Sequence, residues 1–304
     1  MRANERAGYD PDWVSQDRAQ PAEPQTRLRD HADQWRVAIE SVHETVRSLI
    51  AYGQRAEVSV VLKVLKQPGD EWFSGDIVQA FAGNGIARVY EHAGGALLLE
   101  RLSPGNSLVE LSQRGEDERA TEILAQVIAM LRAQHVPTRH VPVGAWGRGF
   151  ERYLASDDTR IPRELVARAR LTFANLVRSQ RDPRLLHGDV QHSNVLFDRE
   201  RGWLAIDPKG VFGELEVELG AVLRNPQEVP QLFTAPRTIE RRVQQLTNAL
   251  DVDRNRVLAW GFAQSVLSAI WSWEDRELGE APVPVLTLAA TLSTMFDDEA
   301  LPRG

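Results

Sequence analysis

The apolar pattern changes about one third of the way along the 304 residues, and this change restricts the possible folds more than any other feature. Residues 35–101 contain short segments rich in β-branched residues, such as AEVSVVLKVL, which are typical of strands. Beyond Ser103-Pro104-Gly105 the apolar residues recur with helical spacing, as in DERATEILAQVIAMLRAQ. The sequence therefore predicts an α+β protein with a small β-rich lobe followed by a larger, mainly helical lobe.

The smaller region is expected to contain about five antiparallel strands and one helix. A helical pattern covers residues 71–82, and Gly94-Gly95 in IARVYEHAGGALLLERL predicts the turn of a hairpin. Residues 1–34, in contrast, are polar and show little apolar periodicity, so we expect a mobile or loosely docked tail. The larger region takes up residues 102–304.

The composition argues against several classes of protein. No run of about 18 apolar residues is present, and the polar N-terminus lacks the apolar core of a signal peptide, so we expect no membrane segment. The absence of cysteine excludes disulfides and thiolate zinc sites and fits a cytoplasmic location. A net charge of -7 argues against nucleic-acid binding and is compatible with a cationic small molecule.

One polar stretch, HGDVQHSNVLFD at residues 187–198, stands directly before an apolar run within the helical region. The runs VLF and WLAI flank RERG, which predicts a hairpin within residues 184–207. A metal site, a catalytic loop and an ordinary polar turn could each explain the polar residues of this stretch.

These explanations differ in what they require of neighbouring residues. A zinc site is disfavoured because His187 and His192 are five residues apart and no second cluster completes the coordination. A plain turn accounts for the Gly, Asp, Ser and Asn residues, but not for Asp207 at the end of the second strand. A hairpin would bring Asp207 near Asn194 and Asp189. Two carboxylates and an amide oxygen form a hard oxygen site that suits Mg²⁺.

These residues also carry a family resemblance. His187-Gly188-Asp189, with Asn194 five residues after the aspartate and Asp207 after the next strand, resembles the catalytic and metal-binding loops of the aminoglycoside phosphotransferase family. The Ile-Asp-Pro of RGWLAIDPKG, followed by Gly213-Glu214, resembles the streptomycin 6-kinase branch, which includes hydroxyurea kinases. The resemblance covers most of residues 35–295. It implies an ATP-dependent kinase of small molecules with a bilobal, protein-kinase-like fold.

The resemblance also implies roles for the residues of the larger lobe. Asp189 would accept a hydrogen bond from the acceptor hydroxyl and act as the catalytic residue. Asn194 and Asp207 would hold one or two Mg²⁺ ions that bridge the phosphates. His187 would brace the loop, and Glu218, which resembles a structural aspartate of the family, would support it.

In the smaller lobe, Lys63 resembles the strand lysine that contacts the α- and β-phosphates of ATP. An isolated lysine in a strand is otherwise costly, although an outward-facing surface residue would also explain it. Its partner should be an acid on the following helix. Glu71 is the preferred candidate, and Asp76, one turn further on, is the alternative.

The remaining nucleotide contacts are expected from backbone groups. In LLLERL the carbonyl of Glu100 and the N–H of Leu102 would bind the adenine edge at the connection between the lobes. Ser41, in the glycine-free stretch 40–45 between the first two strands, is a candidate for a phosphate contact. An ordinary hairpin turn explains this stretch equally well.

The acceptor is expected to be a cationic small molecule, and streptomycin is the preferred candidate. The candidate acceptor residues are Glu214, Trp271, Glu274 and Asp275, because paired carboxylates bind guanidinium groups well. A position on the solvated surface, or in the core for Trp271, would explain the presence of these residues equally well. His192 is expected to be exposed and to have no role. Another aminoglycoside, hydroxyurea, an amine or a sugar metabolite stays open as acceptor, and a nucleotide-binding pseudokinase is the less favoured alternative.

Overall fold

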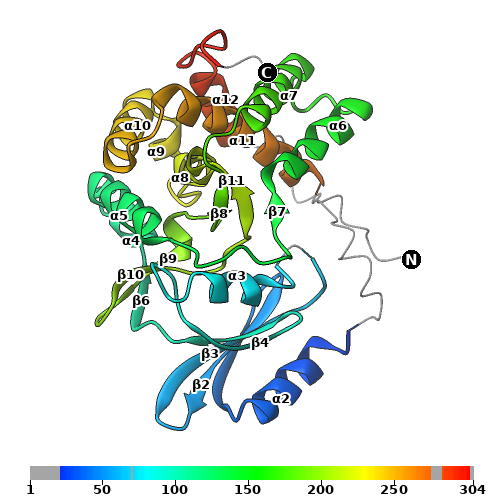
Figure 1. Ribbon diagram of the computed structural model, residues 1–304, viewed down its shortest axis with the longest axis vertical. Helices are drawn as coiled ribbons and strands as arrows, with labels where there is room; N and C mark the ends of the chain where they lie inside the picture. The colour runs from blue at the N-terminus through cyan, green and yellow to red at the C-terminus, as the bar shows by residue number, and fades with distance from the viewer. Residues whose placement is uncertain (1–20, 70, 275–282, 302–304) are drawn as a thin grey trace.

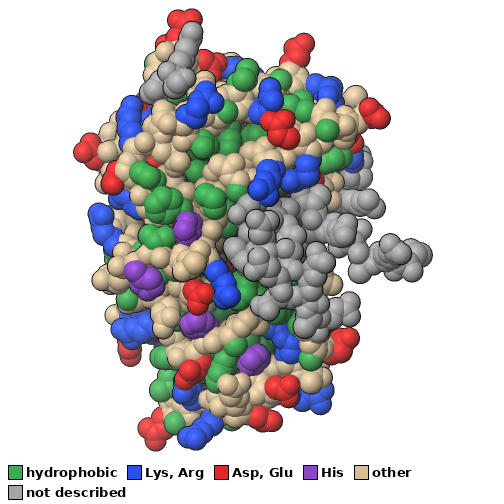
Figure 2. All heavy atoms as spheres, turned by 45° about the vertical axis from the view of Figure 1, so that its right-hand side comes forward, with side chains coloured by type: hydrophobic (Ala, Val, Ile, Leu, Met, Phe, Trp, Pro, Cys, Tyr) green, Lys and Arg blue, Asp and Glu red, His purple; other side chains and the backbone are tan. Residues whose placement is uncertain are grey.

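The computed structural model describes residues 21–69, 71–274 and 283–301. Figure 1 shows a smaller lobe built around one sheet, at the bottom of the view, and a larger lobe made mainly of helices above it. No helix of the described residues is long and apolar enough to cross a membrane. On the face drawn in Figure 2, acidic and basic side chains are interspersed.

The smaller lobe is a five-stranded antiparallel sheet with the order β1-β2-β3-β5-β4. The predicted hairpin is present, and Gly95 in its turn has a φ of +70°, a conformation that glycine adopts without steric cost. The strands are β1 (Ala38–Glu44), β2 (Ser48–Arg55), β3 (Val58–Leu65), β4 (Val89–Ala93) and β5 (Ala96–Glu100).

Part of the predicted polar tail is an ordered helix, α2 (Pro24–Gln34), so that expectation was wrong for these residues. Leu28 and Ala32, one helical turn apart, are buried in the apolar cluster of the smaller lobe. Arg27 donates hydrogen bonds to the carbonyl oxygens of Leu65 and Gly94, each at 2.8 Å. Two apolar positions and one buried arginine are therefore enough to fix a helix whose average composition is polar.

The helix of the smaller lobe, α3 (Ser74–Ala80), is shorter than the predicted span of 71–82. It packs against β4. The segment that follows it, residues 83–88, contacts the larger lobe through a parallel bridge between Ile86 and Ala205. The smaller lobe is thus attached to the larger one at a second place besides the chain connection after β5.

The larger lobe is organised around α11 (Arg254–Glu274), which is buried along most of its length. Its Trp260 and Phe262 are fully buried, and burying a large apolar side chain contributes about 1.5–3 kcal/mol. The other helices of this lobe are α4 (Val109–Gln113), α5 (Asp117–Met130), α6 (Arg148–Ala155), α7 (Arg163–Arg178), α8 (Leu219–Leu223), α9 (Pro230–Thr234), α10 (Pro236–Leu250) and α12 (Val283–Leu292).

The predicted hairpin lies at the boundary between the lobes (Figure 1). It consists of β9 (Val195–Asp198) and β10 (Gly202–Ala205), and β6 (Pro104–Ser107) pairs with β9. Because Val195 pairs with Ala205, the segments before β9 and after β10 lie together. A second small sheet, with the order β7-β11-β8, supports these segments from behind and contains β7 (Val141–Pro142), β8 (Arg184–Leu186) and β11 (Val211–Gly213).

Candidate active site

Backbone hydrogen bonds join the polar loop before β9 to the segment after β10. The N–H of Ile206 donates to the carbonyl oxygen of Asn194 at 2.9 Å. The N–H of Lys209 donates to the carbonyl oxygen of His187 at 2.8 Å. The two segments are therefore fixed to each other, and they carry Asp189, Asn194 and Asp207 on the same end of the hairpin.

Lys63 reaches this end of the hairpin from β3. Its neighbours Leu62 and Val64 point into the core of the smaller lobe, so the alternation of the strand turns Lys63 to the other face. The Nζ atom lies 2.9 Å from Oδ1 of Asp207 and 3.3 Å from Oε2 of Glu71. Burial lowers the pKa of Lys63, but the two carboxylates outweigh this effect, and the pKa lies above its ordinary value.

The partner predicted for Lys63 is therefore the one present, and the alternative is not. Asp76 lies on α3, where its Oδ1 atom is 3.7 Å from Nδ1 of His92. The contact between Lys63 and Asp207 connects the two lobes. It leaves one ammonium group between two carboxylates, at a place that anionic phosphates could reach.

Asp189 has two cationic neighbours. Nζ of Lys209 lies 3.4 Å from Oδ2, and Nη2 of Arg224 lies 3.9 Å from Oδ1. Burial raises the pKa of Asp189, but the charges of Lys209 and Arg224 outweigh this effect and hold the pKa below its ordinary value. The carboxylate is therefore ionised at neutral pH. The Nδ2 atom of Asn194 donates hydrogen bonds to Oδ2 of Asp189 at 3.3 Å and to the carbonyl oxygen of Asp189 at 3.0 Å.

Sequence reasoning assigned no role to either cation. Lys209 stands two residues after Asp207 in the quoted motif, so its position near Asp189 could have been inferred from the same hairpin. Arg224 follows α8, far from both loops in the chain, and nothing in the sequence marks it. Its guanidinium is buried and also donates to Oε1 of Gln264 at 3.2 Å.

The loop that carries Asp189 is held from behind by His187, Gly188 and Glu218. Gly188 has a φ of +82°, and a Cβ atom there would lie 2.5 Å from Cγ2 of Val211, so only glycine fits. Glu218 is buried and accepts the N–H groups of Gly188, at 2.9 Å, and of Val190, at 3.2 Å. Burial raises the pKa of Glu218 to about 7.

His187 is fully buried and uses both ring nitrogens. Nε2 lies 2.9 Å from the carbonyl oxygen of Ile206, and the N–H of Asp189 points to Nδ1 at 3.2 Å. These contacts correspond to the neutral ring that carries its proton on Nε2. Burial lowers the pKa of His187 to about 4, which agrees with a neutral, bracing side chain.

The expectation for His192 was wrong, because this side chain is fully buried. It lies between the charges of Asp117 and Arg242, and burial lowers its pKa to about 3. Arg242 donates to both carboxylate oxygens of Asp117. The second half of the polar loop therefore rests on a buried ion pair that connects α5 and α10.

The residues expected to contact the nucleotide from the smaller lobe and the connection after it lie in different surroundings. Leu102 is nearly buried at the connection between the lobes. Glu100, at the end of β5, uses its carboxylate to accept the N–H of Arg88 at 2.7 Å. Ser41 lies within β1, opposite Tyr52, so it is part of a strand and not of the expected loop. The turn between β1 and β2 lies at residues 45–47 instead.

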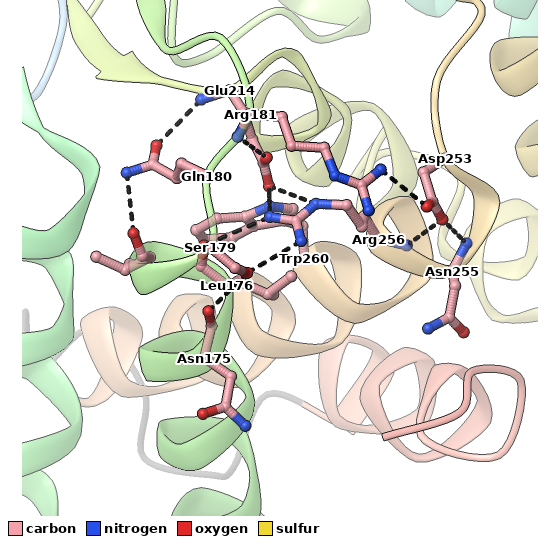
Figure 3. A network of polar contacts seen from close by, with 11 residues as sticks. Asn175, Leu176, Ser179, Gln180, Arg181, Glu214, Asp253, Asn255, Arg256 and Trp260 are labelled. Atoms are coloured by element: carbon pink, nitrogen blue, oxygen red, sulfur yellow. Dashed lines mark hydrogen bonds and ion pairs between the residues drawn. The ribbon is translucent and has the colours of Figure 1, made fainter. Parts of the chain in front are cut away.

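Glu214 was expected to face the acceptor, but it is fully buried. Figure 3 shows its carboxylate within a network of polar contacts. Its Oε1 atom accepts Nε of Arg256 at 3.0 Å and Nε1 of Trp260 at 2.5 Å. Its Oε2 atom accepts the N–H of Arg181 at 2.9 Å. The carboxylate therefore ties α11 to the segment after β11, and it cannot reach a bound molecule.

The other acceptor candidates differ in their surroundings. The side chain of Glu274 is 3% exposed and accepts two hydrogen bonds from Arg152, at 2.6 and 3.0 Å, so it too is already neutralised. Trp271 is partly buried and packs edge-to-face against Trp146, with 5.6 Å between ring centroids. Asp275 lies outside the described residues.

Three comparisons with known proteins agree with this geometry. Residues 35–276 match the family model described as aminoglycoside/hydroxyurea antibiotic resistance kinase. Streptomycin 3''-kinase of Klebsiella pneumoniae is 33% identical over 224 residues, which cover 72% of this chain and 81% of that protein. Hydroxyurea phosphotransferase of Kitasatospora aureofaciens is 29% identical over 264 residues, covering 83% of this chain and 74% of that protein.

The fold is shared with solved structures of more distant sequence. A thermostable aminoglycoside phosphotransferase mutant, in a ternary complex with AMP-PNP and hygromycin B, aligns with a TM-score of 0.62 at 15% identity. The alignment covers 88% of this chain and 98% of that one. The predicted bilobal, protein-kinase-like α+β fold is thereby confirmed.

Proposed function

Because this chain belongs to the family of aminoglycoside/hydroxyurea antibiotic resistance kinases, we propose that it phosphorylates a hydroxyl group of a streptomycin-type aminoglycoside. The chain is an ATP-dependent small-molecule kinase. The identity of the acceptor, the binding of Mg²⁺ and the roles of single residues are the proposed part.

The position of Lys63 carries the proposal for the nucleotide. Its ammonium group comes from the smaller lobe and meets Asp207 of the larger lobe at 2.9 Å. A triphosphate bound between the lobes would meet this cation at its α- and β-phosphates. Glu71 holds the lysine from the other side and would keep it in place when the phosphates compete for its charge.

Asn194 and Asp207 are suited to hold Mg²⁺. The amide nitrogen of Asn194 is turned to Asp189, which leaves the amide oxygen at the opposite end of the group for a cation. Asp207 adds a partly exposed carboxylate, and both donors are the hard oxygens that Mg²⁺ prefers. When bound, Mg²⁺ neutralises charge on the phosphate oxygens.

Asp189 is proposed to orient the acceptor. Its ionised carboxylate would accept a hydrogen bond from the acceptor hydroxyl and aim the oxygen at the γ-phosphorus. As the new P–O bond forms and the bond to ADP breaks, the hydroxyl proton would pass to the carboxylate. Lys209 and Arg224 would hold the carboxylate in position during this step.

The test is a direct assay of the acceptor. The purified protein is incubated with ATP, Mg²⁺ and streptomycin, and mass spectrometry follows the appearance of one added phosphate. We expect phosphorylated streptomycin with wild-type protein and at most a trace of it with Asp189→Asn after the same time. If ATP is consumed with another member of an antibiotic panel but not with streptomycin, the proposed acceptor is wrong while the enzyme class stands.

Hydroxyurea is a second candidate, which one structural observation favours. Two of the carboxylates expected to bind a polycation, Glu214 and Glu274, are already paired with Arg256 and Arg152. A small neutral acceptor would not need them. Including hydroxyurea in the same assay separates the two candidates.

A further inference from the structure

The segment that connects the two lobes forms hydrogen bonds at both of its ends with one turn of the larger lobe. We call residues 100–103 the lobe linker and residues 198–201, which comprise the last residue of β9 and the connection to β10, the hairpin turn. At the far end of the linker, Oδ2 of Asp198 accepts the N–H of Ser103 at 3.0 Å. The N–H of the next residue in the hairpin turn donates to the carbonyl oxygen of Ser103 at 2.9 Å.

At the near end of the linker, Arg201 holds the carboxylate of Glu100. Its Nη1 atom donates to Oε1 of Glu100, and its Nη2 atom donates to the carbonyl oxygen of Gly83 at 2.6 Å. Oε1 of Glu100 also accepts the N–H of Arg88 at 2.7 Å, and Nη1 of Arg88 lies 4.0 Å from Oε2. One guanidinium therefore joins the hairpin turn, the linker and the segment that follows α3.

This contact is sheltered from solvent. The side chains of Arg201 and Glu100 are 20% and 11% exposed, so their attraction is screened less than that of an ordinary surface ion pair. The hydrogen bonds between Ala205 and the segment 83–88, at 2.8 and 2.9 Å, run beside it. The position of Glu100 relative to the larger lobe is thus set by a short, well-defined network.

We propose that Arg201 is a positioning residue for the nucleotide base, acting through Glu100. The inference rests on the proposed function, in which the carbonyl of Glu100 and the N–H of Leu102 contact the adenine edge. Leu102 lies between the two anchored ends of the linker, so releasing one end would let both backbone groups move. Arg201 itself would touch no part of the nucleotide.

The triphosphate provides an internal reference for this proposal. Lys63 would bind phosphates from β3, where its ammonium group is held by Glu71 and Asp207 and not by the linker. Loss of the contact between Arg201 and Glu100 should therefore weaken the binding of ligands that contain adenine more than the binding of inorganic triphosphate. A general loss of structure would weaken both alike.

The experiment measures binding of ATP and of inorganic triphosphate by calorimetry, in the presence of Mg²⁺, to wild type, Arg201→Ala and Glu100→Gln. We expect Kd for ATP to rise about tenfold in either variant, since one charge-assisted contact is lost. Kd for inorganic triphosphate should change less than about twofold. In the double variant the rise in the Kd for ATP should be smaller than the two single effects combined, because both substitutions remove the contact between Arg201 and Glu100. Arg201→Lys keeps the positive charge but lacks the planar guanidinium group with its two Nη atoms. It should therefore recover part of the lost ATP affinity.

The neighbouring Arg199→Ala is the matched control, since Arg199 is exposed in the same turn and its backbone contact survives the change. The inference is overturned if Arg201→Ala binds ATP as wild type does, or if both ligands weaken in parallel. If wild-type protein binds inorganic triphosphate but ATP no more tightly, the linker does not contact the base and the nucleotide part of the proposed function fails too. Unchanged ATP binding in Arg201→Ala, beside tight binding by wild type, rejects only the role of Arg201.

Discussion

Replacement of Glu218 by glutamine should make the stability of the protein less dependent on pH. The folded chain raises the pKa of this buried carboxyl from its ordinary value of 4.5 to about 7. Glutamine has nearly the same shape and carries no charge at any pH. Its carbonyl oxygen can replace Oε1, which accepts the N–H groups of Gly188 and Val190.

The sign and size of the effect follow from proton linkage. Below pH 4.5 the folded and unfolded chains both hold the proton, and the carboxyl adds no pH dependence. Between pH 4.5 and about 7 the unfolded chain releases a proton that the folded chain retains, so the free energy of unfolding falls as the pH rises. A tenfold change in a dissociation constant corresponds to about 1.4 kcal/mol, so the whole penalty is about 3 kcal/mol and is present above pH 7.

Urea denaturation followed by circular dichroism, in buffers from about pH 4.5 to about pH 8, measures this penalty. We expect the free energies of unfolding of wild type and Glu218→Gln to diverge by about 3 kcal/mol across the range, with the variant relatively more stable at the high end. Glu122→Gln, an exposed carboxylate on α5, is the control and should run parallel to wild type. If Glu218→Gln also runs parallel to wild type, the carboxyl is ionised throughout and the reasoning fails.

Three further variants test other parts of the molecule. Asp189→Asn should fold and bind ATP but lose turnover by about 100- to 10,000-fold, measured as phosphate transfer; near-normal turnover would reject its catalytic role. Glu214→Ala leaves Arg256 buried without its carboxylate and should lower the free energy of unfolding by about 3–5 kcal/mol in urea, whereas an unchanged midpoint would contradict the buried pair. Arg27→Ala removes two hydrogen bonds to carbonyl oxygens and should cost about 1–3 kcal/mol by thermal melting, with Arg29→Ala on α2 as the exposed control.

The convergence of Asp189, Asn194 and Asp207 was predictable because it depends on local structure. A hairpin of two short strands has only a few registers, and each of them brings the residues before the first strand close to those after the second. The Lys63–Glu71 contact was predictable for a similar reason, since the two residues are only 8 apart in sequence. The helix was expected to include Glu71, but it begins at Ser74, so Glu71 lies in the turn before it.

The errors concern partners that are distant in sequence. Glu214 and Glu274 resemble acceptor residues until their arginines are known, and these stand 42 and 122 residues away. Likewise, the burial of His192 depends on Asp117 and Arg242, which come from two separate helices. A single sequence shows which residues are charged but not which charges tertiary packing has already neutralised.

The exposed edge of the smaller lobe has a consequence for the local stability of its sheet. All seven residues of β1 are exposed, and the strand borders only β2. Besides its ladder, the strand is retained by surface contacts such as the ion pairs of Glu40 with Arg101 and of Glu44 with Lys66, so it can detach locally at small free-energy cost. Its amides should be among the first in the lobe to exchange with deuterium.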